Sequence, residues 1–256
     1  MNEDGERMSF FSHLEELRHR LLRVVLAIIA GFIVCFFFSK QLLDFLTKPL
    51  SVLLKKPMVF TDLPEPFFVY LKISFVAGVF LVIPIILYQL WKFIAPGLYS
   101  KERKLALPFV MVATSLFYVG GAFAYFLVFP VIFNFFLAFQ DPDKLEALPR
   151  LKEYVTLILK LMLAFGIVFE LPIILTFLGL LGVVNSQFLA RGRRYFIVIA
   201  FVIGALLSPP DVFSQLLMGV PLLILYEVSI CIIRLIEKRR DARDKREELE
   251  SAEEDL

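Results

Sequence analysis

Long runs of apolar residues along the chain alternate with short segments that carry most of its charged residues. A helix that crosses a bilayer needs about 20 consecutive, mostly apolar residues. The apolar runs cover Leu21–Phe38, Phe67–Trp91, Leu105–Phe139, Tyr154–Val184, Tyr195–Leu207 and Val212–Ile236. This pattern predicts an all-α integral membrane protein with six transmembrane helices.

The fifth run, Tyr195–Leu207, is too short for an ordinary crossing. As a helix it would reach roughly 20 Å, whereas the hydrocarbon core of a bilayer is about 30 Å thick. A turn-forming segment, Ser208–Asp211, follows it, and the sixth run begins directly afterwards. A re-entrant hairpin is one interpretation. We favour short fifth and sixth spans, in which a locally thinned bilayer or partner helices would cover the mismatch.

Basic residues in the loops predict the orientation of these helices, because cytoplasmic loops carry an excess of Lys and Arg. They are dense in the N-terminal arm, in the loops before the third and fifth runs, and in the tail, and sparser elsewhere. We therefore expect both termini on the cytoplasmic side. Three regions follow: a cytoplasmic arm with an amphipathic helix start (1–20), a six-helix transmembrane domain (21–236) and a charged cytoplasmic tail (237–256).

The composition agrees with a membrane protein. The chain is 59% hydrophobic, against about 45–50% for soluble domains. Its net charge of +2 gives no reason to expect nucleic acid as a partner. Cys35 and Cys231 lie far apart in apolar runs, so we expect neither a disulfide nor a metal site. The tail alternates basic and acidic residues and should be a solvated extension, either partly helical or disordered.

The segment Ser12–Arg20, which opens the first helix, carries the first candidate residues. The spacing of Ser12 and Glu15 fits a capping box, in which Ser12 is the N-cap and Glu15 folds back to the N–H of the cap. That assignment leaves Glu16 available for binding. The alternative for Glu16 is a solvated charge or an ion pair with Arg20 one helical turn later.

A second carboxylate, Glu102, lies at the same predicted face of the membrane. It follows the turn Pro96-Gly97 and a suitable N-cap for the third helix, Ser100. The helix dipole alone would favour a carboxylate there, which is the simpler interpretation. Glu16 and Glu102 could instead each bind an arginine, because carboxylate–guanidinium pairs form two parallel hydrogen bonds.

Two more carboxylates interrupt apolar runs: Glu170, which is followed by Pro172, and Glu227. Ionisable groups inside a membrane are costly and are functional candidates by default. Pro172 predicts a kink in its helix. The alternative for both carboxylates is a structural hydrogen bond between helices. Lys72 and Lys160 are expected to extend towards the non-cytoplasmic interface.

No enzyme is expected, because the sequence has no metalloprotease, serine-hydrolase or phosphate-loop motif, and no cofactor is implied. Two other classes stay open. A secondary transporter would relay protons through Glu170 and Glu227, although the lack of a strong internal repeat weakens that interpretation. An intramembrane protease would need a serine nucleophile, which nothing in the sequence favours.

Five sequence blocks, in order along nearly the whole chain, resemble those of one family. Ser12–Arg20 resembles the HLxELRxR signature of TatC, the multispanning subunit of the twin-arginine protein translocase. Phe93–Arg103 is similar to its loop motif FIxPxLYxxE(R/K)(R/K). The other matching blocks are Phe123–Phe126, Ala164–Pro172 and Ser208–Val212.

The resemblance implies a receptor in the bacterial inner membrane that binds twin-arginine signal peptides of folded proteins at the cytoplasmic face. The residues that match the family's signal-binding surface are Glu16, Arg18, Phe93, Glu102 and Arg103. Export would use the proton-motive force, without a bound nucleotide. The partners implied are single-span subunits of the TatA and TatB type, and self-association is expected as well.

The resemblance also implies a cupped bundle whose concave face holds Glu170. The residues expected to contact partner helices are Glu170, Ser208, Gln215 and Glu227. Pro49 and Asp211 match family positions on the far side of the membrane. Departures from the family pattern are minor: Glu15 is an additional acidic residue, and Ala205 is smaller than its counterpart in some relatives.

Overall fold

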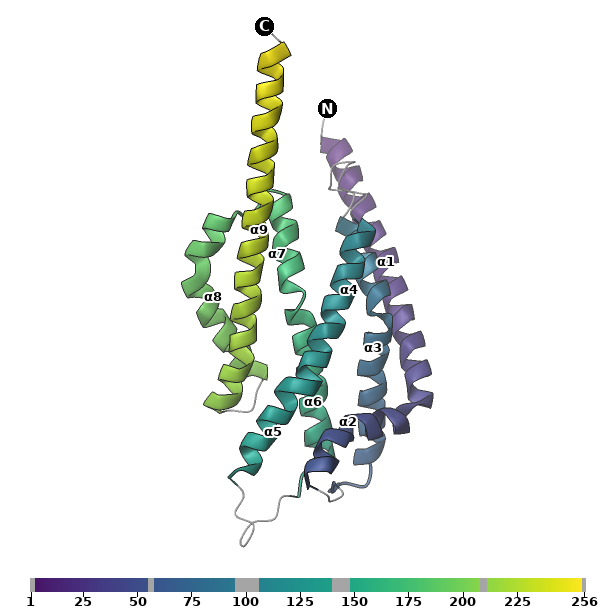
Figure 1. The fold of residues 1–256 in the computed structure, drawn as a ribbon. Coiled ribbons are helices and arrows are strands. Elements are labelled where there is room, and N and C mark those ends of the chain that lie inside the picture. Colours follow the sequence, from purple (N-terminus) through teal and green to yellow (C-terminus); the bar gives the residue numbers. More distant parts are fainter. Residues whose placement is uncertain (1–2, 55–57, 95–105, 140–147, 208–210, 255–256) are drawn as a thin grey trace. The chain divides into compact units, whose positions relative to one another are not determined.

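A computed structural model describes residues 3–54, 58–94, 106–139, 148–207 and 211–254 (Figure 1). Within these ranges the ordered elements are helices, apart from one isolated β-bridge between Val59 and Arg150. The all-α prediction is therefore confirmed. The chain divides into two compact units, Met1–Leu163 and Ala164–Leu256, each of which is described by itself.

The helices divide between the two units. The first unit contains α1 (Glu3–Phe37), α2 (Ser39–Leu54), α3 (Glu65–Ile94), α4 (Ala106–Phe123), the π-helical turn η3 (Ala124–Val128), α5 (Phe129–Leu137) and most of α6 (Leu151–Val168). The second unit contains the end of α6, α7 (Leu171–Leu180), α8 (Ser186–Leu207) and α9 (Val212–Glu254). The third apolar run is thus one continuous helical path through α4, η3 and α5.

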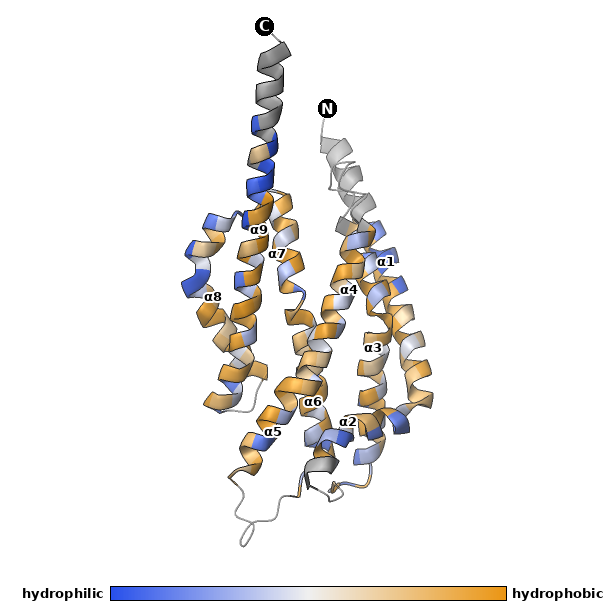
Figure 2. Cartoon of the chain, in the orientation of Figure 1, coloured by the Kyte–Doolittle hydropathy of each residue, from blue (hydrophilic) through white to orange (hydrophobic). Residues whose placement is uncertain are grey.

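In the part of the chain that the structure describes, five helical segments are long and apolar enough to cross a membrane. They are Leu14–Phe37, Glu65–Phe93, Leu107–Leu137, Leu151–Leu180 and Val212–Arg240. Each coincides with a predicted run. In their most apolar windows only 11% to 44% of the residues are buried inside the protein. Figure 2 shows these helices as predominantly hydrophobic, which is the surface of a protein whose solvent is lipid.

α8 carries the short fifth run and lies antiparallel beside α9 (Figure 1). At its start, the backbone N–H of Ser186 donates to Glu237 at 2.8 Å. Near its end, a Cβ on Gly204 would lie 3.1 Å from the carbonyl oxygen of Gln215. The 22 residues of α8 reach about 33 Å, so the chain returns along the whole apolar part of α9. These contacts favour a short crossing over a re-entrant hairpin.

The sixth apolar run lies in α9 (Val212–Glu254), which extends well beyond it. α9 has 43 residues, and its apolar part, Val212–Arg240, has 29. The helix continues through the charged tail to Glu254, since the Lys, Arg and Glu residues that end the apolar run are good helix formers. Figure 2 shows the change from hydrophobic to hydrophilic residues along α9. The tail is therefore helical rather than disordered.

The start of α1 also differs from the prediction. The helix begins at Glu3, so Ser12 lies inside it and the capping box is wrong. Residues inside a helix already have a partner for the backbone N–H, and an N-cap has no role there. The backbone carbonyl of Glu15 instead receives a hydrogen bond from Nδ1 of His19 at 2.9 Å.

α1 and α3 pack closely through a pair of glycines. A Cβ on Gly31 would lie 2.8 Å from the carbonyl oxygen of Gly78, and a Cβ on Gly78 would lie 2.6 Å from the backbone nitrogen of Phe32. Larger side chains at either position would force the two backbones apart, so glycine permits this approach. Nearer the N-terminus, Arg20 reaches the carbonyl of Gln89. The two contacts define an antiparallel register between α1 and α3.

α2 is an amphipathic helix, whereas the sequence prediction treated its residues as a loop between two spans. Its apolar side buries Leu46 and Leu50, whereas Lys40, Asp44 and Lys48 are exposed. The spacing of four between these members of each set is the helical signal. The helix is too polar to cross a bilayer, and its pattern is that of a helix lying along one.

Glu65 joins the starts of α3 and α6. Its carboxylate accepts the backbone N–H of Thr61 at 3.0 Å and that of Lys152 at 2.9 Å. The isolated bridge between Val59 and Arg150 lies in the same two segments. Because Glu65 is only 4% exposed, these bonds satisfy a buried charge and fix the connections at this end of the unit.

Candidate functional site

The first candidate surface lies at the end of the α1–α3 pair. The antiparallel register places Glu16 level with Phe93, which is in the last turn of α3. Phe93 is partly buried, and Arg18 is exposed on α1. Glu102 and Arg103, the other residues predicted for this surface, lie outside the described residues. The structure therefore brings three of the five predicted residues to one end of one helix pair.

Glu16 forms an ion pair with Arg20 one helical turn later. The Glu16 side chain is 38% exposed, whereas that of Arg20 is only 9% exposed. Arg20 also donates to the carbonyl oxygen of Gln89 in α3, at 3.4 Å. The ion pair with Arg20, which was the alternative interpretation of Glu16, is therefore present in the structure. Arg20 was not among the predicted site residues, although it ends the signature segment Ser12–Arg20 and lies one helical turn after Glu16.

An aromatic stack lies near this end of α3. Trp91 stacks on Phe109 of α4 with ring centroids 4.8 Å apart. The stack joins α3 to α4 across residues 95–105, which include the predicted loop.

Glu170 lies at a break between two helices. α6 ends at Val168 and α7 begins at Leu171, with Pro172 in the first turn of α7, where a missing N–H is tolerated. The kink predicted from Pro172 is confirmed. Glu170 is 8% exposed and makes no capping bond with its side chain. Its Oε1 is buried and has no hydrogen-bond partner among the described residues, so the structural alternative does not account for it.

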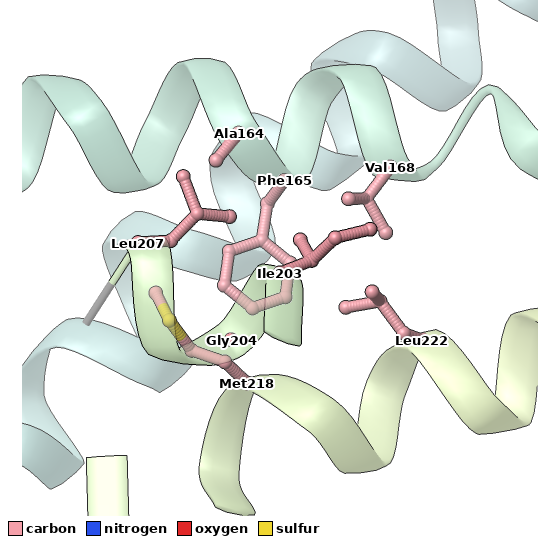
Figure 3. Close-up of a pocket in the computed structure, with 8 residues that line it drawn as sticks. All are labelled: Ala164, Phe165, Val168, Ile203, Gly204, Leu207, Met218 and Leu222. Carbon is pink, nitrogen blue, oxygen red and sulfur yellow. The ribbon is translucent and has the colours of Figure 1, made fainter. Parts of the chain in front are cut away.

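An apolar crevice lies in the second unit between the end of α6, α8 and α9 (Figure 3). The residues that line it are Ala164, Phe165, Val168, Ile203, Gly204, Leu207, Met218 and Leu222. Figure 3 shows their side chains converging, with carbon and one sulfur as the only side-chain atoms. The crevice suits apolar groups and offers nothing to bind a polar solute.

Gln215 and Asp211 lie at the start of α9. Nε2 of Gln215 donates to the carbonyl of Phe201 in α8 at 3.0 Å. Asp211 is the N-cap of α9, since its Oδ1 accepts the N–H of Ser214 at 2.7 Å. Ser208, which was predicted beside them, lies outside the described residues. Gln215 therefore ties the two helices together at the end next to the crevice.

Glu227 is paired with Arg193 of α8. Nε of Arg193 donates to Oε1 at 2.6 Å, and Nη2 donates to Oε2 at 2.8 Å. Beside this pair, Tyr226 stacks on Phe196 with ring centroids 4.0 Å apart. Both carboxylate oxygens of Glu227 are thus occupied by a hydrogen bond between helices, which was the alternative to a functional role. This pairing does not favour a proton relay through Glu227.

Pro49 lies inside α2, where it removes one helical hydrogen bond. A proline at position 49 cannot donate to the carbonyl of Phe45 four residues earlier. Tyr125 does so instead, with its hydroxyl 2.6 Å from that oxygen and its ring stacked on Phe45. Sequence analysis placed Pro49 on the far side but could not identify Tyr125, because the pair is distant in sequence.

These features define a class: a multi-pass α-helical membrane protein with carboxylates at helix ends and breaks. The sequence profile described as Sec-independent protein translocase protein (TatC) matches residues 12–221. The chain belongs to this TatC family, which makes it a non-enzymatic component of protein transport. Neither the transporter nor the protease interpretation agrees with that membership.

Individual relatives cover almost the whole chain. A Sec-independent protein translocase protein TatC from Magnetococcus marinus is 47% identical over 255 residues, which are 98% of this chain and 94% of the relative. The protein of that name from Escherichia coli K12 is 40% identical over 225 residues, 87% of each chain.

Solved structures agree with the fold. A crystal structure described as the twin-arginine translocase receptor TatC has a TM-score of 0.79 and 42% identity, covering 87% of this chain and 98% of that one. A second such crystal structure has a TM-score of 0.81 and 40% identity.

Proposed function

We propose that this chain is the receptor subunit of a twin-arginine translocase and binds the arginine pair of signal peptides on folded proteins. The solved relatives are described as twin-arginine translocase receptors. The observation that carries the proposal is the Glu16 carboxylate, which lies at the end of the α1–α3 pair and already accepts a guanidinium, that of Arg20. An arginine of the signal peptide needs the same acceptor chemistry.

The second arginine is proposed to bind Glu102, which follows α3 in sequence. Arg18, Phe93 and Arg103 complete the surface, with Phe93 beside the apolar part of the peptide. Two carboxylates match two guanidinium groups one to one. An arginine pair is therefore selected over other basic pairs, because only guanidinium can form two parallel hydrogen bonds with each carboxylate.

Purified chain in nanodiscs and a labelled twin-arginine signal peptide test this proposal. We expect Glu16→Gln and Glu102→Gln each to raise the Kd about 10- to 100-fold, since a hydrogen bond to a charged group contributes about 1.5–3 kcal/mol. Glu15→Gln is the matched control, because Glu15 is exposed and the charge change is identical. Unchanged binding in both variants and in the double variant would contradict the proposal.

Single-span partner subunits are proposed to dock on the α8–α9 pair. Gln215 lies beside the apolar crevice, and Ser208 and Glu170 are proposed to add polar contacts to a partner helix. The apolar part of α8 is shorter than the hydrocarbon core, and a partner helix would cover the difference. Further copies of this chain are proposed to assemble with them. The receptor is proposed to lie in the bacterial inner membrane with both termini cytoplasmic, and export is proposed to use the proton-motive force.

A further inference from the structure

We infer that Arg20 is a positioning residue of the receptor site, which holds the Glu16 carboxylate in the geometry that the signal guanidinium requires. The inference rests on the proposed function of Glu16 and adds a residue that does not itself touch the peptide. It comes from the contacts of Arg20, which join α1 to α3.

The burial of Arg20 is the first observation. Arg20 is 7% exposed, which is rare for an arginine in a surface helix. A buried guanidinium needs partners for its N–H groups. The structure gives Nη2 the carboxylate of Glu16 and Nη1 the carbonyl oxygen of Gln89, at 3.4 Å. Arg20 is therefore held between the two helices and cannot turn away without leaving these groups unpaired.

The consequence for Glu16 follows from the same contacts. A glutamate on an exposed helix face samples several rotamers, and binding a ligand would then require ordering it. The pair with Arg20 orders Glu16 before the ligand arrives, and its fixed end is anchored to the backbone of α3 rather than to another mobile side chain. With 38% of its side chain exposed, Glu16 remains accessible, and a carboxylate has about four acceptor sites.

Specificity for arginine depends on the same ordering. A guanidinium presents a rigid planar fork, whereas the ammonium of lysine is a point charge that tolerates any orientation of the carboxylate. An ordered Glu16 therefore favours a twin-arginine peptide over a twin-lysine peptide. Loss of Arg20 should therefore weaken binding of the twin-arginine peptide and also lower its preference over the twin-lysine peptide.

A double-mutant cycle tests the inference with the full chain in nanodiscs and both peptides. We expect Arg20→Gln to raise the Kd for the twin-arginine peptide about tenfold in the chain with Glu16, but less than about twofold in the Glu16→Gln background. Arg20→Lys keeps the charge but not the fork, and we expect it to lower the twin-arginine over twin-lysine preference by a similar factor. Arg23→Gln, the same change at an exposed position of α1, should alter neither quantity.

The outcomes distinguish the role of Arg20 from the receptor function of Glu16. If Glu16→Gln, Glu102→Gln and the double variant all bind normally, the proposed function fails. If only Glu16→Gln binds normally, the role of Arg20 is overturned, because Arg20 acts through Glu16. Two outcomes would overturn only the role of Arg20. In the first, Glu16→Gln loses binding but Arg20→Gln binds normally. In the second, Arg20→Gln weakens binding by the same factor with Glu16 present and in the Glu16→Gln background. Tighter binding by Arg20→Gln would also overturn it, because Arg20 would then be a competitor. Should Arg20→Gln not fold, the Arg20→Lys preference ratio decides in the same way.

Discussion

Pro84 lies inside α3 without breaking the helix, just as Pro49 lies inside α2. The carbonyl that Pro84 leaves without its helical donor is that of Phe80, four residues earlier. The hydroxyl of Tyr118 in α4 donates to that oxygen at 2.9 Å. At both prolines, therefore, a tyrosine from another helix replaces the missing N–H. Neither pairing was predictable from sequence, because the partners are 38 and 80 positions apart.

Tyr125→Phe should destabilise the first unit by about 0.5–1.5 kcal/mol, since it removes the hydrogen bond that replaces the missing N–H of Pro49 at the part-buried Phe45 carbonyl. Tyr154→Phe is the matched control. Tyr154 donates to the neighbouring carbonyl of Leu46 at 2.7 Å, but Leu50, four residues on, is not proline and keeps its own N–H. Thermal unfolding of the purified variants in one detergent should therefore show a clearly larger effect for Tyr125→Phe.

Pro49→Ala provides the second arm of this test. Alanine restores the N–H that bonds to Phe45, so Tyr125→Phe should lose less stability in the Pro49→Ala background than in the chain with proline. Equal losses in both backgrounds would show that the hydroxyl of Tyr125 has no special role at the proline.

The functional roles of the predicted site residues stay predictions, but the structure shows the surroundings of several of them. Glu170 was identified because a carboxylate inside an apolar run is costly, and its buried position at a helix break agrees with that reasoning. Arg20 was passed over because its burial depends on the packing of α3 against α1. The pairing of Glu227 with Arg193 likewise depends on how α8 and α9 pack.

At the scale of elements, hydrophobic runs predicted the membrane helices well and the remaining helices poorly. α2 was missed because its amphipathic pattern is too polar for a span, and the extension of α9 was missed because charged residues ended the run. The start of α1 was misplaced by a capping motif whose residues lie inside the helix. Periodicity identifies apolar faces, but helix ends depend on contacts that a single sequence does not show.

α8 is the element on which partner docking should be measured. Its outward side carries Val198, Val202 and Leu206, spaced by one helical turn, and Leu206 is 70% exposed. A photo-crosslinker at position 206 should join to a single-span partner subunit when both are produced together. Phe126 is also 70% exposed but lies in η3 of the first unit, so the same crosslinker there is the control. Equal yields at the two positions would argue against docking on α8.

At the scale of the whole molecule, the sequence predicted the all-α class and the family, because each depends on composition and order along the chain. The division into two units was not predicted, since it depends on contacts between residues far apart in sequence. Orientation in the membrane is still a prediction, based on the dense basic residues of the arm and tail.

Single cysteines at positions 98 and 144, in a chain with Cys35 and Cys231 replaced, should report this orientation. A membrane-impermeant maleimide should label position 144 in cells whose outer membrane has been permeabilised, and position 98 only in inverted vesicles.

Import of a twin-arginine substrate by those vesicles should stop when an uncoupler dissipates the proton gradient. The opposite labelling pattern would contradict the orientation, and import unaffected by the uncoupler would contradict the energy source.

The two tyrosines that hold α2 have a consequence for how the protein is made. Tyr125 and Tyr154 donate to α2 from 80 and 108 positions further along the chain. During synthesis α2 therefore reaches the membrane surface well before either donor leaves the ribosome. Until then the Phe45 carbonyl must be solvated by water or lipid headgroups. The two hydrogen bonds from Tyr125 and Tyr154 to α2 can form only after the third and fourth apolar runs have been made.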